Sequence, residues 1–130
     1  MSLLIDTSIL VALEREDKAI ISNIDDLRKS DPSPPSISLI NYFEFMYGIQ
    51  KRNAKNKSDA ISFIELFEFL TPTKKTAIIL ADLKYKYEKL GESFSLSDLF
   101  IASQAIENNM LLVTRDKHFN DLEELKKIIL

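Results

Sequence analysis

Short apolar runs alternate along the chain with segments whose apolar residues recur at helical spacing. The runs at residues 2–5 and 110–113 contain almost no polar side chain, which predicts strands buried on both faces of a sheet. Shorter extended segments are expected at residues 36–38, 69–71 and 126–130. Helices are predicted at residues 9–13 (after capping residues 6–8), 18–29, 39–52, 59–69, 76–90, 97–108 and, with a weaker pattern, 119–125.

Breaks between these elements are marked by proline, glycine and polar residues. Residues 30–35 hold three prolines and must form a loop. The polar, basic segment 53–58 predicts a connection, and Gly91 is expected to cap the helix that precedes it. Strands that alternate with helices predict an α/β sandwich around a mostly parallel sheet.

Composition narrows the classes of protein that fit. A chain of 130 residues that is 45% hydrophobic suits a single domain, residues 1–130, with its own core. The absence of cysteine excludes disulfides, cysteine-zinc sites and thiol nucleophiles, and it fits the reducing cytoplasm. No apolar stretch is long enough to span a membrane, and Asp6 interrupts the N-terminal run, which does not read as a signal peptide.

Two aspartates follow predicted strands. Asp6 comes directly after the first strand, and two residues separate Asp116 from the strand that ends at Val113. If these strands are parallel, both aspartates lie at the same edge of the sheet, where such sheets bind ligands. The plain alternatives are a helix cap for Asp6 and a turn residue for Asp116.

Glu44 interrupts a helix that is apolar nearly all round. Asn41, Glu44 and Gly48 share one stripe of this helix, and the missing side chain of Gly48 permits close approach. A carboxylate on so buried a helix needs a partner, because an unpaired buried charge is very costly. A lysine or arginine could supply it, but a metal ion shared with other acids is the better partner.

Asp98 opens a helix and shares its inward face with Ile101 and Ala102. Ser95 and Asp98 also have the spacing of a capping box, so a structural role is equally supported. Taken together, the four acids predict a Mg²⁺ site, because this ion prefers oxygen ligands. A bound divalent ion keeps crowded carboxylates ionised and supports hydrolysis of a phosphodiester.

The chain resembles the PIN-domain ribonucleases, in particular the VapC-type toxins of toxin–antitoxin pairs. The resemblance covers nearly the whole chain, and four motifs in the family's order carry it: residues 4–8 (LIDTS), 41–48 (NYFEFMYG), 98–102 (DLFIA) and 112–119 (LVTRDKHF). One departure is that Asn41 stands where the family often has serine or threonine.

The resemblance implies a Rossmann-like α/β/α sandwich that cleaves RNA endonucleolytically with Mg²⁺ or Mn²⁺. It also implies an antitoxin partner and a homodimer. The residues that it assigns as catalytic, metal-binding acids are Asp6, Glu44, Asp98 and Asp116. Those that it assigns as supporting residues are Ser8, Asn41 and Thr114.

Other features of the sequence have two readings. Arg115 and Lys117 flank Asp116 and can meet phosphate, although Arg115 could also pair with that aspartate. The basic run at residues 51–57 could bind RNA phosphates or an acidic partner, and a solvated connection fits equally well. His118 reads as a lone surface histidine, and the aromatic residues around Glu44 read as a core or dimer interface rather than a base-stacking surface.

Two rival functions remain open from the sequence. One is a non-catalytic PIN-like module that binds RNA or protein, which a metal titration would distinguish. The other is a DNA nuclease of the same fold, because no motif reads the ribose 2′-hydroxyl. A net charge of −3 is low for any nucleic-acid binder, so such a function requires that the basic residues cluster.

Overall fold

A parallel sheet forms the centre of the computed structural model, which describes residues 1–130 apart from the side chain of Ala54. In the described chain, the sheet has five strands in the order β3-β2-β1-β4-β5, and all neighbouring pairs are parallel. The strands are β1 (Leu3–Ile5), β2 (Ser36–Ile37), β3 (Glu68–Phe69), β4 (Leu111–Thr114) and β5 (Lys127–Ile129). The sheet is therefore wholly parallel, where the sequence predicts a mostly parallel one.

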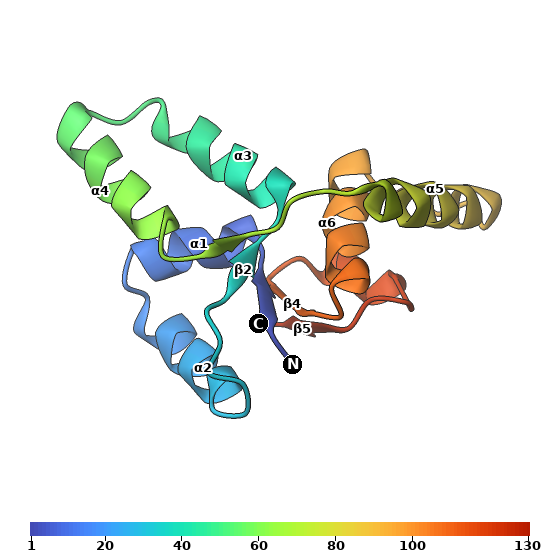
Figure 1. Cartoon of the computed structure of the whole chain (residues 1–130), viewed down its shortest axis with the longest axis horizontal. Coiled ribbons are helices and arrows are strands. Elements are labelled where there is room, and N and C mark those ends of the chain that lie inside the picture. The colour runs from blue at the N-terminus through green and yellow to red at the C-terminus, as the bar shows by residue number, and fades with distance from the viewer.

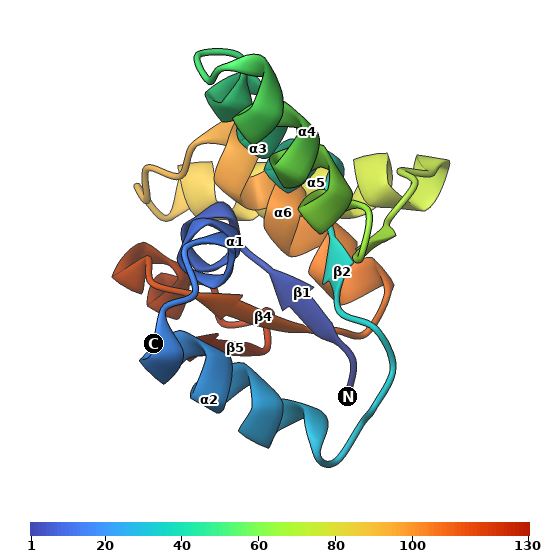
Figure 2. The ribbon, with the colours of Figure 1, turned by 90° about the vertical axis from the view of Figure 1, so that its left-hand side faces the viewer.

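Helices cover both faces of this sheet (Figures 1 and 2). They are α1 (Thr7–Glu14), α2 (Lys18–Arg28), α3 (Leu39–Ile49), α4 (Ala54–Ile64), α5 (Lys74–Lys89), α6 (Leu96–Glu107) and the 3-10 helix η1 (Lys117–Asp121). Leu3 and Ile5 of β1 pack into one core with α1 to α4, whereas Leu4 packs into a second core with α5 and α6. This alternation follows from the two-residue period of a strand and confirms the predicted α/β/α sandwich.

The start of α4 differs from the prediction. The connection expected at residues 53–58 is wrong, because Asn53 caps a helix there and its side chain accepts a hydrogen bond from the Asn56 N–H at 3.0 Å. The helix accommodates this polar start because its buried positions, Ala60 and Ile64, come later. Within the described residues, no helix has the length and hydropathy that crossing a bilayer requires.

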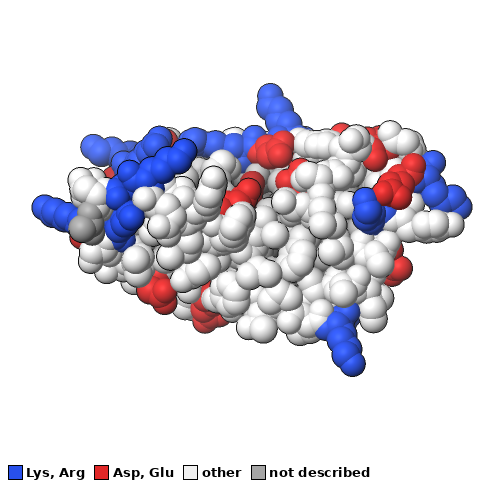
Figure 3. All heavy atoms as spheres, turned by 90° about the horizontal axis from the view of Figure 1, so that it is seen from above, with Lys and Arg blue, Asp and Glu red and all other residues white. Residues whose placement is uncertain are grey.

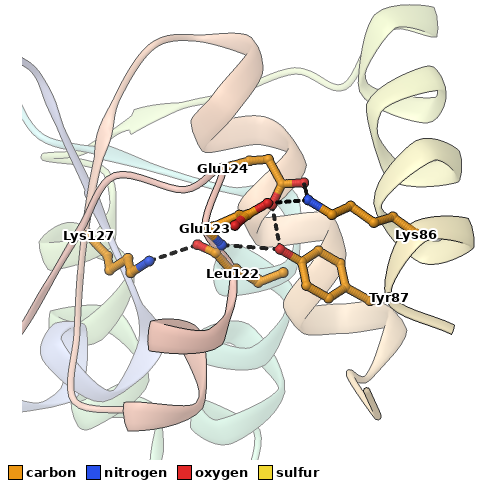
Figure 4. A network of polar contacts seen from close by, with 6 residues as sticks. All are labelled: Lys86, Tyr87, Leu122, Glu123, Glu124 and Lys127. Carbon is orange, nitrogen blue, oxygen red and sulfur yellow. Dashed lines mark hydrogen bonds and ion pairs between the residues drawn. The ribbon is translucent and has the colours of Figure 1, made fainter. Parts of the chain in front are cut away.

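The end of α5 is tied to the segment that follows η1 (Figure 4). The Tyr87 hydroxyl donates to Glu124 at 2.5 Å and accepts from the Glu123 N–H at 3.1 Å, while the Lys86 ammonium contacts both glutamates. Burial raises the pKa of the Tyr87 phenol, and its bond to Glu124 raises it further. Gly91, with a φ of 75°, closes α5 as predicted.

A buried glutamine on α6 joins two other segments. Gln104 is fully buried; its side-chain oxygen accepts from the Leu39 N–H at 2.9 Å, and its NH₂ group donates to the Leu70 carbonyl at 2.9 Å. These bonds fix the first residue of α3 and the chain just after β3 against α6. Gln104 therefore helps to set where α3 begins.

Gln104→Leu should lower the free energy of unfolding by about 1–3 kcal/mol, because it leaves the Leu39 N–H and the Leu70 carbonyl without their partners at a partly buried place. Urea denaturation followed by circular dichroism measures the change. The control Gln50→Leu, at an exposed position, should change stability by less than about 0.5 kcal/mol. Equal effects of the two substitutions would contradict this role of Gln104.

Candidate active site

The central strands β1 and β4 end together at one edge of the sheet. Ile5 pairs with Val113, and the N–H of Asp6 donates to the Val113 carbonyl at 3.0 Å. Asp6 thus lies at the edge where Thr114 ends β4. Ligands of parallel α/β proteins bind at this carboxyl edge.

The Asp6 carboxylate is held by donors from three segments. Its Oδ1 accepts from the Thr7 N–H at 2.9 Å and from Asn41 Nδ2 at 3.0 Å, and its Oδ2 accepts from the Thr114 hydroxyl at 2.5 Å. Asn41 is oriented in turn by the Ser38 hydroxyl, which donates to its Oδ1 at 2.6 Å. These hydrogen bonds fix the direction in which a charged side chain faces.

Glu44 reaches this edge from α3. The Thr7 hydroxyl donates to Glu44 Oε1 at 2.6 Å and lies 3.1 Å from Asn41 Nδ2, which donates to it. Two expectations are wrong here. Glu44 is exposed rather than buried, and beyond its chain neighbours and the backbone of its own helix, no atom lies within 4 Å of the place where a side chain on Gly48 would begin. The helix is apolar on most sides but buried mainly on one, so Glu44 and Gly48 are exposed, whereas Asn41, at the start of the same stripe, is buried against Asp6.

Two further carboxylates belong to the same edge. Asp98 lies in the first turn of α6. Asp116 follows β4, with its N–H donating to the Thr114 hydroxyl at 3.0 Å and its Oδ1 accepting from the His118 N–H at 2.9 Å. Burial raises the pKa of the Asp98 carboxyl, and the negative charges of Asp116 and Asp6 raise it further. The aspartates are therefore close enough to repel one another.

An open hollow of about 370 Å³ brings together the acids that the sequence singles out. The residues that line it are Asp6, Thr7, Ser8, Glu44, Asp98, Ile101, Arg115 and Asp116. Within the described residues, no three histidine, cysteine or acidic side chains stand close enough to form a ready-made metal cluster. Like charges oppose closer approach, and a divalent cation would remove that opposition.

The donor set of this hollow fits a hard divalent cation. The residues that line the hollow supply carboxylate and hydroxyl oxygens, which Mg²⁺ and Mn²⁺ prefer to nitrogen or sulfur. The buried hydroxyl oxygen of Ser8 has no hydrogen-bond partner within the described residues, so it is available to a ligand or its water. Because Mg²⁺ retains several waters, an open hollow suits it better than a closed cage.

The residues that follow β4 differ in how they relate to the hollow. Arg115 lines the hollow, and its guanidinium lies 3.4 Å from the Asp17 carboxylate instead of pairing with the next residue. Lys117 is exposed and is not among the residues that line the hollow. His118 is not a lone surface side chain, because it is half-buried and stacks on Phe94 with ring centroids 4.3 Å apart.

Sequence reasoning assigns neither Thr7 nor Ser38 a role in the active site, yet both belong to it. Thr7 bridges Asn41 and Glu44, and Ser38 caps α3 while orienting Asn41. Each hydroxyl stands at the start of a helix, which is a visible signal. However, a capping hydroxyl and a site hydroxyl look alike in a sequence.

The fold and the hollow define a parallel α/β protein with an acidic site at the carboxyl edge of its sheet. The model of the PIN domain family matches residues 3–125. The chain therefore belongs to the PIN-domain family.

Individual relatives cover nearly the whole chain. Ribonuclease VapC2 of Rickettsia felis is 30% identical over an alignment of 131 residues. The alignment covers 98% of this chain and 92% of that protein. The structure of VapBC2 from Rickettsia felis bound to a promoter DNA fragment is similar with a TM-score of 0.87 and 27% identity, covering 100% of this chain and 99% of that chain. VapBC-1 from nontypeable Haemophilus influenzae gives a TM-score of 0.81 and 25% identity, with 99% and 98% covered.

In metal-free protein, the Asp98 carboxyl should titrate above its ordinary pKa of 3.8. Asp116→Asn removes one of the charges that raise this pKa, so Asp98 should then titrate at lower pH. NMR of the carboxyl carbons across a pH series with chelator present measures both values. Asp82→Asn, an exposed residue of α5, removes the same charge elsewhere and should leave Asp98 unchanged. Equal shifts in the two variants would refute the coupling.

Proposed function

We propose that this chain is a Mg²⁺-dependent endoribonuclease and the toxin of a toxin–antitoxin pair. The observation that carries the proposal is the hollow shared by Asp6, Glu44, Asp98 and Asp116 at the sheet edge of a PIN domain. RNA is favoured as substrate because a relative that is 30% identical over nearly the whole chain is named a ribonuclease. A chain without cysteine suits the reducing cytoplasm as its place of action.

The four carboxylates are the groups that would hold Mg²⁺ or Mn²⁺ in this hollow. Such an ion, when bound, would supply an activated water as the nucleophile and positive charge to offset the charge that develops on the phosphodiester. The unpartnered Ser8 hydroxyl supplies an additional oxygen at the same place. No histidine or cysteine is needed for this chemistry.

The chain's own residues orient the acids and the substrate. Thr114 and Asn41 fix the Asp6 carboxylate, and Thr7 fixes that of Glu44, so little rearrangement is needed when substrate arrives. The guanidinium of Arg115 is on the lining of the hollow, where it can donate to phosphate oxygens. Lys117 would contact a neighbouring phosphate from outside the hollow.

An antitoxin is the partner that this proposal includes. The two solved structures described above carry the name VapBC and match this chain from end to end, at 27% and 25% identity. Inhibition by a cognate protein follows from the resemblance to VapC-type toxins. A toxin that cleaves RNA in its own cell requires such an inhibitor.

A second copy of the chain is also part of the proposal. Leu39, Phe43 and Tyr47 follow one another at four-residue spacing on α3, with relative exposures of 38%, 60% and 65%. The rings of Phe43 and Tyr47 stack with centroids 6.0 Å apart. A contiguous exposed apolar stripe on a helix favours burial against a partner, and a homodimer would cover it.

Asp6→Asn and Asp98→Asn should each reduce Mg²⁺-dependent RNA cleavage by roughly 100-fold or more, because each removes a charged oxygen that holds the ion. Labelled single-stranded RNA incubated with Mg²⁺ or with chelator gives the rates, and circular dichroism checks the fold. Asp82→Asn is the matched control and should cleave like the wild type.

Several results would overturn the proposal. Undiminished cleavage by both variants would remove these acids from the site. Wild-type protein that binds RNA but never cleaves it with Mg²⁺ or Mn²⁺ would be a binding module. Cleavage of DNA of the same sequence in preference to RNA would make the chain a DNA nuclease.

A further inference from the structure

The helices α1 and α3 lie side by side and run in a similar direction (Figure 1). At the hollow, Thr7 of α1 contacts Glu44 of α3. At the far end, Glu14 of α1 contacts Arg52, just beyond α3, through two hydrogen bonds of 2.5 and 2.7 Å. The eight residues of α1 span about 12 Å, so one seam joins the hollow to a second place on the surface.

The seam is open between its two ends. Glu44 and Gly48 are four residues apart on α3, so they share one stripe of the helix, and Arg52 lies in the turn that follows it. Gly48 is exposed, and no atom from another part of the protein lies within 4 Å of the place where its side chain would begin. An extended chain leaving the hollow would therefore meet no obstruction from this position.

A second hollow, of about 510 Å³, lies at the far end of the seam. It is lined by Glu14, Arg15, Arg52, Asn56, Asp59 and Phe63. The Arg52 guanidinium neutralises Glu14. The Arg52 side chain is 30% exposed and that of Glu14 is 15% exposed, so the pair forms an ordered part of the lining. Arg15 remains exposed beside it.

Positive charge gathers around this second hollow. The segment between Glu44 and Asp59 contains no acid but holds Lys51, Arg52, Lys55 and Lys57. Figure 3 shows lysine and arginine massed over the end of the molecule where α4 begins, with acidic side chains toward the middle of the same face. A chain with a net charge of −3 thus separates its positive surface from its acidic hollow.

We propose that Arg15, Lys51 and Lys55 form a phosphate-binding surface that holds the RNA strand after it leaves the acidic hollow along the α1–α3 seam. This inference rests on the proposed ribonuclease function and names the path of its substrate. The three side chains contact phosphates away from the bond that is cleaved. They therefore set affinity for long RNA without touching the reacting atoms.

The seam begins at the acidic hollow, and this connection favours RNA over an acidic protein segment as the ligand of the basic surface. A strand whose one phosphate lies among the four carboxylates must be held elsewhere, because those acids repel the rest of its backbone. These three exposed cations lie in the segments where the seam ends, Arg15 directly after α1, Lys51 just beyond α3 and Lys55 at the start of α4. Asp59 in the lining, and Glu16 beside Arg15, leave the surface positive but not strongly so.

The test compares two triple variants with equal charge. Arg15→Gln/Lys51→Gln/Lys55→Gln removes the proposed surface, and Lys74→Gln/Lys75→Gln/Lys126→Gln removes three exposed lysines elsewhere. Each takes the net charge from −3 to −6, since three positive charges are lost. Fluorescence anisotropy with chelator present measures binding of an RNA of about 16 nucleotides and of one of about four nucleotides. Thermal melting checks that both variants fold.

The first variant should bind the longer RNA about tenfold more weakly and show a salt dependence shallower by about two units, because roughly 0.7 units are lost per phosphate contact. Its binding of the short RNA, and its rate on that RNA with Mg²⁺, should match the wild type. The control variant should retain most of the affinity for long RNA.

Equal losses in the two variants would overturn the proposal, because they would reflect net charge alone. So would equal losses on short and long RNA. If poly-glutamate binds the wild type more tightly than RNA and loses affinity in the first variant, the surface is a protein-docking site instead. The chelated binding assay is independent of cleavage, so failure of the proposed activity would be seen separately in the Mg²⁺ reactions.

Discussion

The parallel pairing of β1 with β4 is the constraint on which the site depends. In this register Ile5 lies beside Val113, so Asp6 and Thr114 leave the sheet at the same edge, 108 residues apart in sequence. The Thr114 hydroxyl can then bond the Asp6 carboxylate, while Asn41 approaches the other carboxylate oxygen from α3. A slip of one residue in either strand would turn these side chains to opposite faces and dismantle the arrangement.

At this edge of the sheet, the crowding of carboxylates that a cation site needs is unfavourable for the stability of the chain alone. Hydrogen bonds hold Asp6 and Glu44 in place, yet the Asp98 pKa is raised by burial and by the charges of Asp116 and Asp6. Such crowding is unfavourable in the chain by itself and becomes favourable only when a cation is shared. The same separation of charge leaves the basic residues at the far end of the α1–α3 seam, where a polyanion can be held.

The α/β/α fold follows from the sequence because its two main strands are short apolar runs and its helices carry polar caps. The four acids could be chosen from sequence because three of them lie at starts of helices or ends of strands, which topology brings to one edge. The features that the sequence could not predict depend on tertiary contacts. It did not reveal that Glu44 is exposed, that Thr7 joins it to Asn41, or that Asn53 starts α4. An apolar helix does not show which of its sides the rest of the chain will cover, and capping residues do not show which hydroxyls also serve a site.

The most direct test of the shared-cation claim is paramagnetic NMR with Mn²⁺ in place of Mg²⁺, which is practical for a 14.9 kDa chain. Substoichiometric Mn²⁺ should broaden the amide signals of residues 6–8, 44, 98 and 116 before all others, and excess Mg²⁺ should restore them. Asp98→Asn should weaken the effect at every one of these positions together. Broadening spread over exposed acids such as Asp82, or centred away from the hollow, would contradict the account.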